Sequence, residues 1–301
     1  MDLEQKKTLR RLIGCFALFL ILRLVEELVV IPKYVDSKGV VACLGGIVVL
    51  LFYIRFVNKP LEDIGMIFSG HKIRKAIGMT AILNIIPAVL VFAGEYLIYS
   101  RKDGYAHLSV YYESVDRSYS RGGLQGLLIG IGICLALAVL HGFFYEMAFR
   151  GLLITLGSRS LPFNAVNAIQ AGLYTFWYLI PVVRLLLFAP EGLYSAERMI
   201  RLVLFTLAYE MITAVKLGML RNASGSVWVC IFDHIAFAFI LDMLHLQFSS
   251  SVGVLSTDMS YYGRLLAYQG ISLFITYIYY AKKTKKVKEI QQKIQLESQN
   301  A

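Results

Sequence analysis

The chain has 301 residues, of which 57% are hydrophobic, and its mean hydropathy is +0.63. That composition is too apolar for an ordinary soluble domain and indicates a protein that lies in a membrane. The formal net charge is +10. We do not expect a nucleic-acid partner, because the basic residues are dispersed along the flanks of apolar segments rather than gathered in one patch.

Apolar runs long enough to cross or nearly cross a bilayer recur along the whole chain. We expect eight of them, near residues 12–31, 39–57, 77–99, 123–149, 163–183, 199–220, 225–246 and 262–281. The fourth is too long for a simple span, so it is expected to tilt or to project beyond the bilayer. We therefore predict an all-α fold, a polytopic membrane bundle of about eight transmembrane helices that forms one domain over residues 1–281.

Three basic clusters predict the orientation of this bundle. They lie at the N-terminus, in the 58–76 connection and in the 282–301 tail, whereas the 101–121 and 247–261 loops mix charges or lean acidic. Eight spans place all three clusters on one side, and the positive-inside rule makes that side cytoplasmic. We expect a multi-pass protein of the cell (plasma) membrane with both termini in the cytoplasm, an amphipathic connector at 58–76 and a basic tail able to touch anionic lipid.

The spacing of the cysteines predicts no metal site, and the first apolar run predicts a helix that is not cleaved off. The four cysteines lie far apart in apolar runs, at Cys15, Cys43, Cys134 and Cys230. None has the spacing of a metal site, and disulfides are not expected. The first apolar run lacks a small-residue cleavage site, so it is expected to stay as a helix. We expect no metal and no cofactor.

The fourth run holds the first candidate site, within His141-Gly-Phe-Phe-Tyr-Glu-Met-Ala-Phe-Arg150. Glu146 and Arg150 are four residues apart, so on a helix they share a face and can pair. The pair is either structural, allowing both charges to enter the membrane, or part of a catalytic carboxylate cluster. Tyr145 lies about 100° around the helix from Glu146, so we expect the two side chains not to serve the same spot. We also expect Arg150→Ala to destabilise the protein more than Glu26→Ala does.

Two further segments carry candidate residues. Trp177 and Tyr178 precede Pro181 in the fifth run, which is typical of an interfacial aromatic belt. His234 follows Asp233 in the seventh run. A histidine there can stabilise an oxyanion, act as a base or ligate a metal, and it can equally bond a neighbouring helix.

Together these segments resemble the CAAX-protease and bacteriocin-processing family (CPBP, also called Abi), the glutamic intramembrane proteases. That family has Glu-Glu-x-x-x-Arg on one helix, then Phe-x-x-x-His, then His-x-x-x-Asn after a Gly-Ser-x-Trp-like entry. The similar segments here are Glu146-Met-Ala-Phe-Arg150, Tyr174-x-x-x-Tyr178, Gly225-Ser-Val-Trp228 and His234-x-x-x-Ala238, with Lys59-Pro-Leu-Glu-Asp-Ile-Gly65 as a lead-in. The resemblance implies a CAAX-protease-like core at about 120–250.

The chain departs from this family at the residues that carry its chemistry. The resemblance implies that the first glutamate and the second-motif histidine activate water, while the third-motif histidine and asparagine stabilise the oxyanion. These positions are Tyr145, Tyr178, His234 and Ala238 here. Tyrosine, with an ordinary pKa of about 10, is a poor general base at neutral pH. Alanine also removes an oxyanion donor, an effect of about 10²–10³ in rate in other enzymes.

A substitute for the missing carboxylate is available in the sixth run. Glu210 could point into the site, or it could pair with a basic residue on the same run, the candidates being Lys216, Arg221 and Arg201. Whether Asp233 also faces the site is left open. No second histidine is placed to complete a zinc triad.

Three functions follow from this pattern. The first is a catalytically degenerate pseudoprotease, which retains Glu146, Arg150 and His234 and acts as a scaffold or regulator of a membrane or envelope protein. The second is an active intramembrane endopeptidase with a rearranged site, which cuts a peptide substrate near the cytoplasmic face. The third is a transporter-like protein, although matched Gly/Pro-broken helices are not evident in the two halves.

Overall fold

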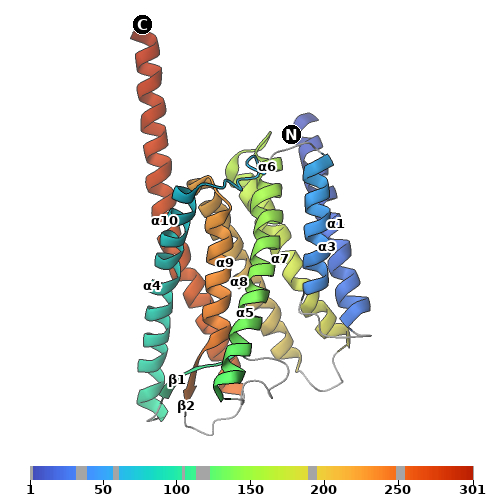
Figure 1. The fold of residues 1–301 in the computed structure, drawn as a ribbon, viewed down its shortest axis with the longest axis vertical. Coiled ribbons are helices and arrows are strands. Elements are labelled where there is room, and N and C mark those ends of the chain that lie inside the picture. The colour runs from blue at the N-terminus through green and yellow to red at the C-terminus, as the bar shows by residue number, and fades with distance from the viewer. Residues whose placement is uncertain are drawn as a thin grey trace.

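The computed structural model describes residues 3–31, 39–56, 61–103, 106–112, 123–188, 195–248 and 255–300. In this part the fold is all-α apart from one short β-ribbon, and its helices run side by side along a common axis (Figure 1). The helical elements are α1 (Leu3–Val25), η1 (Glu26–Val30), α3 (Val40–Phe56), α4 (Gly70–Asp103), α5 (Gly123–Tyr145), η3 (Glu146–Leu153), α6 (Ile154–Gly157), α7 (Phe163–Phe188), α8 (Ala196–Ser224), α9 (Trp228–Met243) and α10 (Leu255–Asn300).

Four described helical segments are long and apolar enough to cross a membrane. They are Gly70–Ile98, Gly123–Gly157, Phe163–Phe188 and Ala196–Ser224, and Val40–Arg55 is a shorter apolar helix. The other expected spans fall short by length or composition. For example, α9 has 16 residues, and α1 continues into η1 with two adjacent glutamates. The protein is thus a helical membrane protein by composition and fold.

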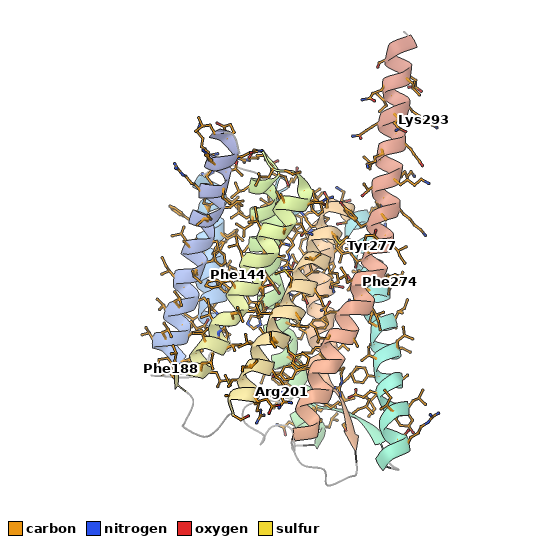
Figure 2. All side chains as sticks on the ribbon, turned by 180° about the vertical axis from the view of Figure 1, so that it is seen from behind. Phe144, Phe188, Arg201, Phe274, Tyr277 and Lys293 are labelled. Atoms are coloured by element: carbon orange, nitrogen blue, oxygen red, sulfur yellow. The ribbon has the colours of Figure 1, made fainter. Side chains whose placement is uncertain are left out.

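The outer surface of the bundle is apolar. Val48, Phe52 and Leu128 are 59–72% exposed. Figure 2 shows Phe274 and Tyr277 on α10, and both of these side chains are also more than half exposed. A continuous apolar surface of this kind suits the hydrocarbon of a bilayer and would promote aggregation in water.

A β-ribbon lies at the end of the bundle opposite the C-terminal tail (Figure 1). The strands β1 (Ala106–Val110) and β2 (Leu244–Phe248) pair antiparallel, with Ala106 opposite Phe248. Beyond the ribbon, Tyr111 N donates to Met243 O over 3.0 Å. The sequence predicted a loop at 101–121, but it assigned residues 244–246 to the seventh span and only 247–248 to the following loop. Strand pairing here satisfies backbone groups near the ends of α4 and α9.

The connector and the tail adopt different structures. Residues 61–69 form a turn and an irregular segment, and α4 begins at Gly70, so the second half of the expected connector is helical. The turn is fastened to the bundle because Val227 N donates to Gly65 O over 3.0 Å and Thr155 Oγ1 donates to Asp63 O over 3.3 Å. The tail continues α10 as one helix that projects from the bundle, with Lys293 on the projecting part (Figure 2).

A π-helical segment interrupts the central rod. The rod is continuous from Gly123 to Gly157, and η3 lies in its C-terminal third, with all eight of its residues buried. π-Helical turns are rare and concentrate at functional sites. Here the π-segment begins at Glu146, so the change of winding coincides with the first candidate motif.

Glycines bring the neighbouring helices close to this rod. A Cβ on Gly142 of α5 would lie 3.4 Å from the Ile231 carbonyl and 3.5 Å from the His234 Cβ, both on α9. A Cβ on Gly46 of α3 would overlap the ring of Phe144, which is fully buried. The close approach of α9 to α5 is what carries His234 to the level of Glu146.

Candidate functional site

Glu146 is the centre of the candidate site. It is fully buried at the start of η3. Its Oε1 atom accepts a hydrogen bond from Arg150 Nη1 over 3.2 Å and lies 3.1 Å from His234 Nδ1. The family-motif residues on α5–η3 and on α9, which are 88 positions apart in the sequence, therefore meet at one carboxylate oxygen.

Arg150 lies between this carboxylate and an aromatic ring. Its guanidinium carbon is 4.1 Å from the ring centroid of Tyr174, a cation–π contact, and its side chain is fully buried. Among the described residues, Glu146 Oε2 and Arg150 Nε and Nη2 lack a hydrogen-bond partner of good geometry. Polar atoms left in this state inside a protein are uncommon, so this buried cluster calls for a physical explanation.

Tyr145 lies in a box of rings. The ring centroids of its neighbours are 5.5–6.3 Å away, and these neighbours are His141, Tyr174, Trp177, Tyr178 and His234. Tyr145 and Glu146 both touch His234, but their polar ends lie apart, since the Glu146 carboxylate meets Arg150 and His234 while the Tyr145 hydroxyl lies beside Gly39. Glu146 meets the Nδ1 atom while Tyr145 packs against the ring, at the point where the winding changes from α to π.

The interfacial belt predicted for Trp177 and Tyr178 is wrong. Trp177 is fully buried, and its ring packs against Phe144, Tyr145 and Phe149. Pro181 lies inside α7 rather than at its end, so these aromatic residues fall in the middle of a span. They belong to the core cluster and to the box around Tyr145.

Glu210 is buried on α8 without an ion-pair partner in the described part of the chain. It is 5% exposed and interacts electrostatically with Arg150 and Tyr174. The three basic residues considered as partners are engaged elsewhere: Lys216 pairs with Asp233 (2.6 Å), Arg201 pairs with Glu197 (3.1 Å) and Arg221 packs against Gly65. Glu210 is therefore near the site but outside its ion pairs.

Asp233 and Ala238 add nothing to the site. Asp233 turns to the other side of α9, where it accepts hydrogen bonds from Lys216 Nζ over 2.6 Å and from Asn84 Nδ2 over 2.9 Å. Tyr268 of α10 extends this network by donating to Asn84 Oδ1 over 2.9 Å. Ala238 is one turn beyond His234 on α9, and its methyl group offers no donor.

A second buried ion cluster adjoins the box, and sequence reasoning gave it no role. Arg23 lies 3.3 Å from Glu26 and 3.1 Å from Glu27, and Arg184 of α7 lies 2.7 Å from Glu27. A Cβ on Gly39, whose φ is +87°, would lie 2.9 Å from Arg23 Nη1 and 3.5 Å from the Tyr145 hydroxyl. The charges in the first run were a visible signal, but their contacts with Trp177 and Arg184 on α7 depend on long-range packing.

In the ranges that the structure describes, His, Cys, Asp and Glu do not gather in a group of three that could hold a metal ion. No protein-family model and no curated protein matches the chain.

Proposed function

We propose that the chain is a multi-pass cell-membrane protein with a CPBP-like architecture of eight spans and cytoplasmic termini. In this proposal it is a degenerate protease that acts as a scaffold or regulator of a membrane or envelope protein. The meeting of Glu146, Arg150 and His234 supports the resemblance, because the motifs that carry it are the ones brought together. The motif residues then serve to fix α5, η3 and α9 against one another.

The box around Tyr145 is the observation that carries this proposal. A hydrolytic base must hold a water molecule and accept its proton. At the position that the family resemblance assigns to this base, a phenol packs among the rings of Tyr174, Trp177 and Tyr178. Ring packing there contributes to stability through burial and edge-to-face contact, while it leaves no carboxylate to activate water.

A comparison of the wild type with a restored variant tests the loss of activity. We expect purified wild-type protein in detergent to leave membrane-anchored reporter peptides intact. The restored variant carries Tyr145→Glu, Tyr178→His and Ala238→Asn, and a gain of cleavage in this variant would support the assignment of these positions. Cleavage by the wild type that His234→Ala abolishes would contradict the proposal.

The scaffold role needs its own test. Photocrosslinking from Phe274 or Tyr277, on the exposed face of α10, should capture a specific membrane partner in native membranes. The crosslink should persist in Glu146→Gln, provided that this variant accumulates normally, because the proposed role needs no catalysis. Loss of the crosslink in folded Glu146→Gln, together with cleavage of the captured protein by the wild type, would replace the scaffold with an enzyme–substrate pair.

An active endopeptidase is the second candidate, and the state of Glu210 favours it. A buried carboxylate without an ion-pair partner, within electrostatic range of Arg150, is a possible general base. In this case wild-type protein cuts a membrane-anchored peptide and Glu210→Ala reduces the rate by at least about 10². Glu197→Ala is the matched control, because Glu197 lies on the same helix in an exposed ion pair.

A further inference from the structure

A cavity lies between α8 and α10, apart from the Glu146 site. Its volume is about 140 Å³, close to the roughly 150 Å³ that takes up a benzene-sized molecule in an engineered protein core. Three aromatic residues and two leucines line it, namely Phe205, Tyr209, Tyr262, Leu265 and Leu266. Thr206 and Glu210 complete the lining, so the chemistry of the cavity is one carboxylate, hydroxyls and rings.

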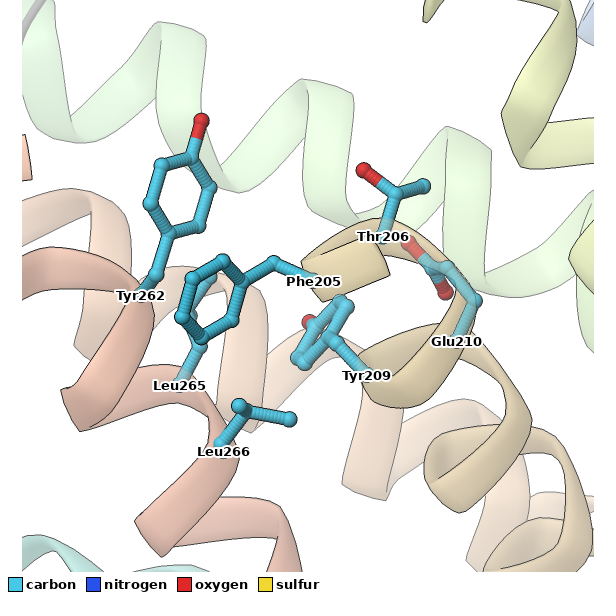
Figure 3. A pocket seen from close by; sticks show the side chains of 7 residues that line it. All are labelled: Phe205, Thr206, Tyr209, Glu210, Tyr262, Leu265 and Leu266. Carbon is cyan, nitrogen blue, oxygen red and sulfur yellow. The ribbon is translucent and has the colours of Figure 1, made fainter. Parts of the chain in front are cut away.

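The carboxylate and the rings occupy different ends of this cavity. Figure 3 shows Glu210 beside Thr206 on α8, and the rings of Phe205, Tyr209 and Tyr262 grouped toward α10. The Phe205 and Tyr262 rings stack at 5.2 Å. The residues that carry these rings are half-buried, whereas Glu210 is only 5% exposed. The Glu210 carboxyl therefore lies at the deeper end of the cavity.

Glu210 has no ion-pair partner of its own among the described residues. Arg150 is the cation that interacts with it, but the Arg150 guanidinium is bonded to Glu146. Arg264, next to the cavity residue Leu265 on α10, binds both oxygens of Glu95 over 2.8 and 2.9 Å. A buried carboxyl in a membrane protein is costly to ionise without a cation beside it, so a bound cation would stabilise its charged form.

We propose that this cavity binds a primary ammonium group that carries a short carbon chain. The ammonium would donate to Glu210 and to the Thr206 hydroxyl, and the chain would lie against the rings, which also attract a cation through their π-faces. An anion is excluded by the carboxylate. One carboxylate with hydroxyls is too few hard ligands for a bare divalent cation, which takes six or more oxygens.

Two sources supply this chemistry, a lipid with an amine headgroup and a free amine. Phe205 and Tyr209 lie about two and a half and three and a half turns from the start of α8, and Tyr262 lies about two turns from the start of α10. Both helices start at the end of the bundle that carries the β-ribbon (Figure 1). Glu210 is the midpoint of α8, about four turns inside its end, so a lipid amine would have to enter deeply between the helices, whereas a free amine needs only the cavity. The shared ammonium chemistry is the proposal, and the experiment separates the sources.

Thermal unfolding of the full-length protein in detergent is the first test, with butylammonium as the probe and butanol and butyrate as matched controls. We expect butylammonium alone to raise the Tm, with saturation, because a ligand that binds only the folded state stabilises it. Glu210→Gln should abolish the shift, Phe205→Leu should weaken it at least tenfold in apparent affinity, and Glu197→Gln should keep it. An equal shift in Glu210→Gln, or no shift in the wild type, overturns the proposal.

Native mass spectrometry from nanodiscs is the second arm. Wild-type protein from phosphatidylethanolamine nanodiscs that retains a lipid, when Glu210→Gln does not, identifies a lipid amine as the source. Butylammonium binding without such retention identifies a free amine. Neither readout measures cleavage or a protein partner, so failure of this proposal is distinguishable from failure of the proposed function.

Discussion

Arg150 shows how a single residue can hold a buried site together. Its guanidinium donates to Glu146 and stacks on Tyr174, so one side chain connects η3 to α7. Glu146 in turn contacts His234 on α9. Removal of the arginine leaves the carboxylate with the histidine as its remaining described partner, and burial makes that loss expensive.

We expect Arg150→Ala to lower the free energy of unfolding by about 3–5 kcal/mol, the usual cost of removing one partner from a buried ion pair. Arg201→Ala is the matched control, because Arg201 pairs with Glu197 on the exposed surface of α8. Unfolding in detergent by circular dichroism measures both. Equal stability of the two variants would mean that the Glu146–Arg150 pair contributes no more than a surface pair.

The same structure revises the comparison of Arg150 with Glu26. Sequence reasoning predicted that Glu26→Ala is the milder change. However, Glu26 is fully buried, lies 3.3 Å from Arg23, and accepts hydrogen bonds from Val41 N and Ala42 N at the start of α3. We now expect Glu26→Ala to be about as destabilising as Arg150→Ala. The sequence could not show this, because the bond from η1 to α3 depends on how the two helices meet.

Helices in this protein approach one another through glycines at particular contacts. Gly46 on α3 faces the ring of Phe144 on α5, and Gly142 on α5 faces α9. The apolar runs predicted where helices would form. They could not predict the π-winding of η3 or the in-line continuation into α6, because both depend on tertiary packing around Glu146. They also missed the ribbon, since its two strands are short and far apart in the sequence.

Gly46→Ala should lower the free energy of unfolding by about 1–3 kcal/mol, because the added methyl overlaps Phe144 in a filled core. Gly14→Ala is the control. A Cβ on Gly14 meets nothing within 4 Å, so the same change there should be neutral or stabilise by up to about 1 kcal/mol through helix propensity. If both variants unfold at the same temperature, the contact between α3 and α5 can accommodate an added methyl group.

Across the whole molecule, buried ion pairs connect helices that are far apart in the sequence. Glu95 on α4 binds Arg264 on α10, and Lys216 on α8 pairs with Asp233 on α9. These pairs place their charges inside the bundle. The sequence shows only that charges occur within the apolar runs. It could not identify the partners, so Glu210 was matched with basic residues that turn out to be engaged elsewhere.

A double-mutant cycle on Glu95→Ala and Arg264→Ala should give a coupling energy of about 1–3 kcal/mol, because the pair is bidentate and buried. The exposed pair Lys285–Glu289, with its atoms 4.0 Å apart, is the control and should couple by less than about 0.5 kcal/mol. Comparable coupling in the two cycles would indicate that burial adds little to the α4–α10 contact.

The length of α10 has a mechanical consequence. The helix is unbroken from Leu255 to Asn300, and its last residues, 282–300, extend about 28 Å from the bundle at about 1.5 Å per residue. A rigid arm of that length turns a tilt of about 10° within the membrane into a displacement of about 5 Å at its tip. Tyr262 and Leu265, which line the cavity beside Glu210, lie near the opposite end of the same helix. If the packing around the cavity changes the tilt of α10, the resulting displacement is largest at the basic C-terminal end of the helix.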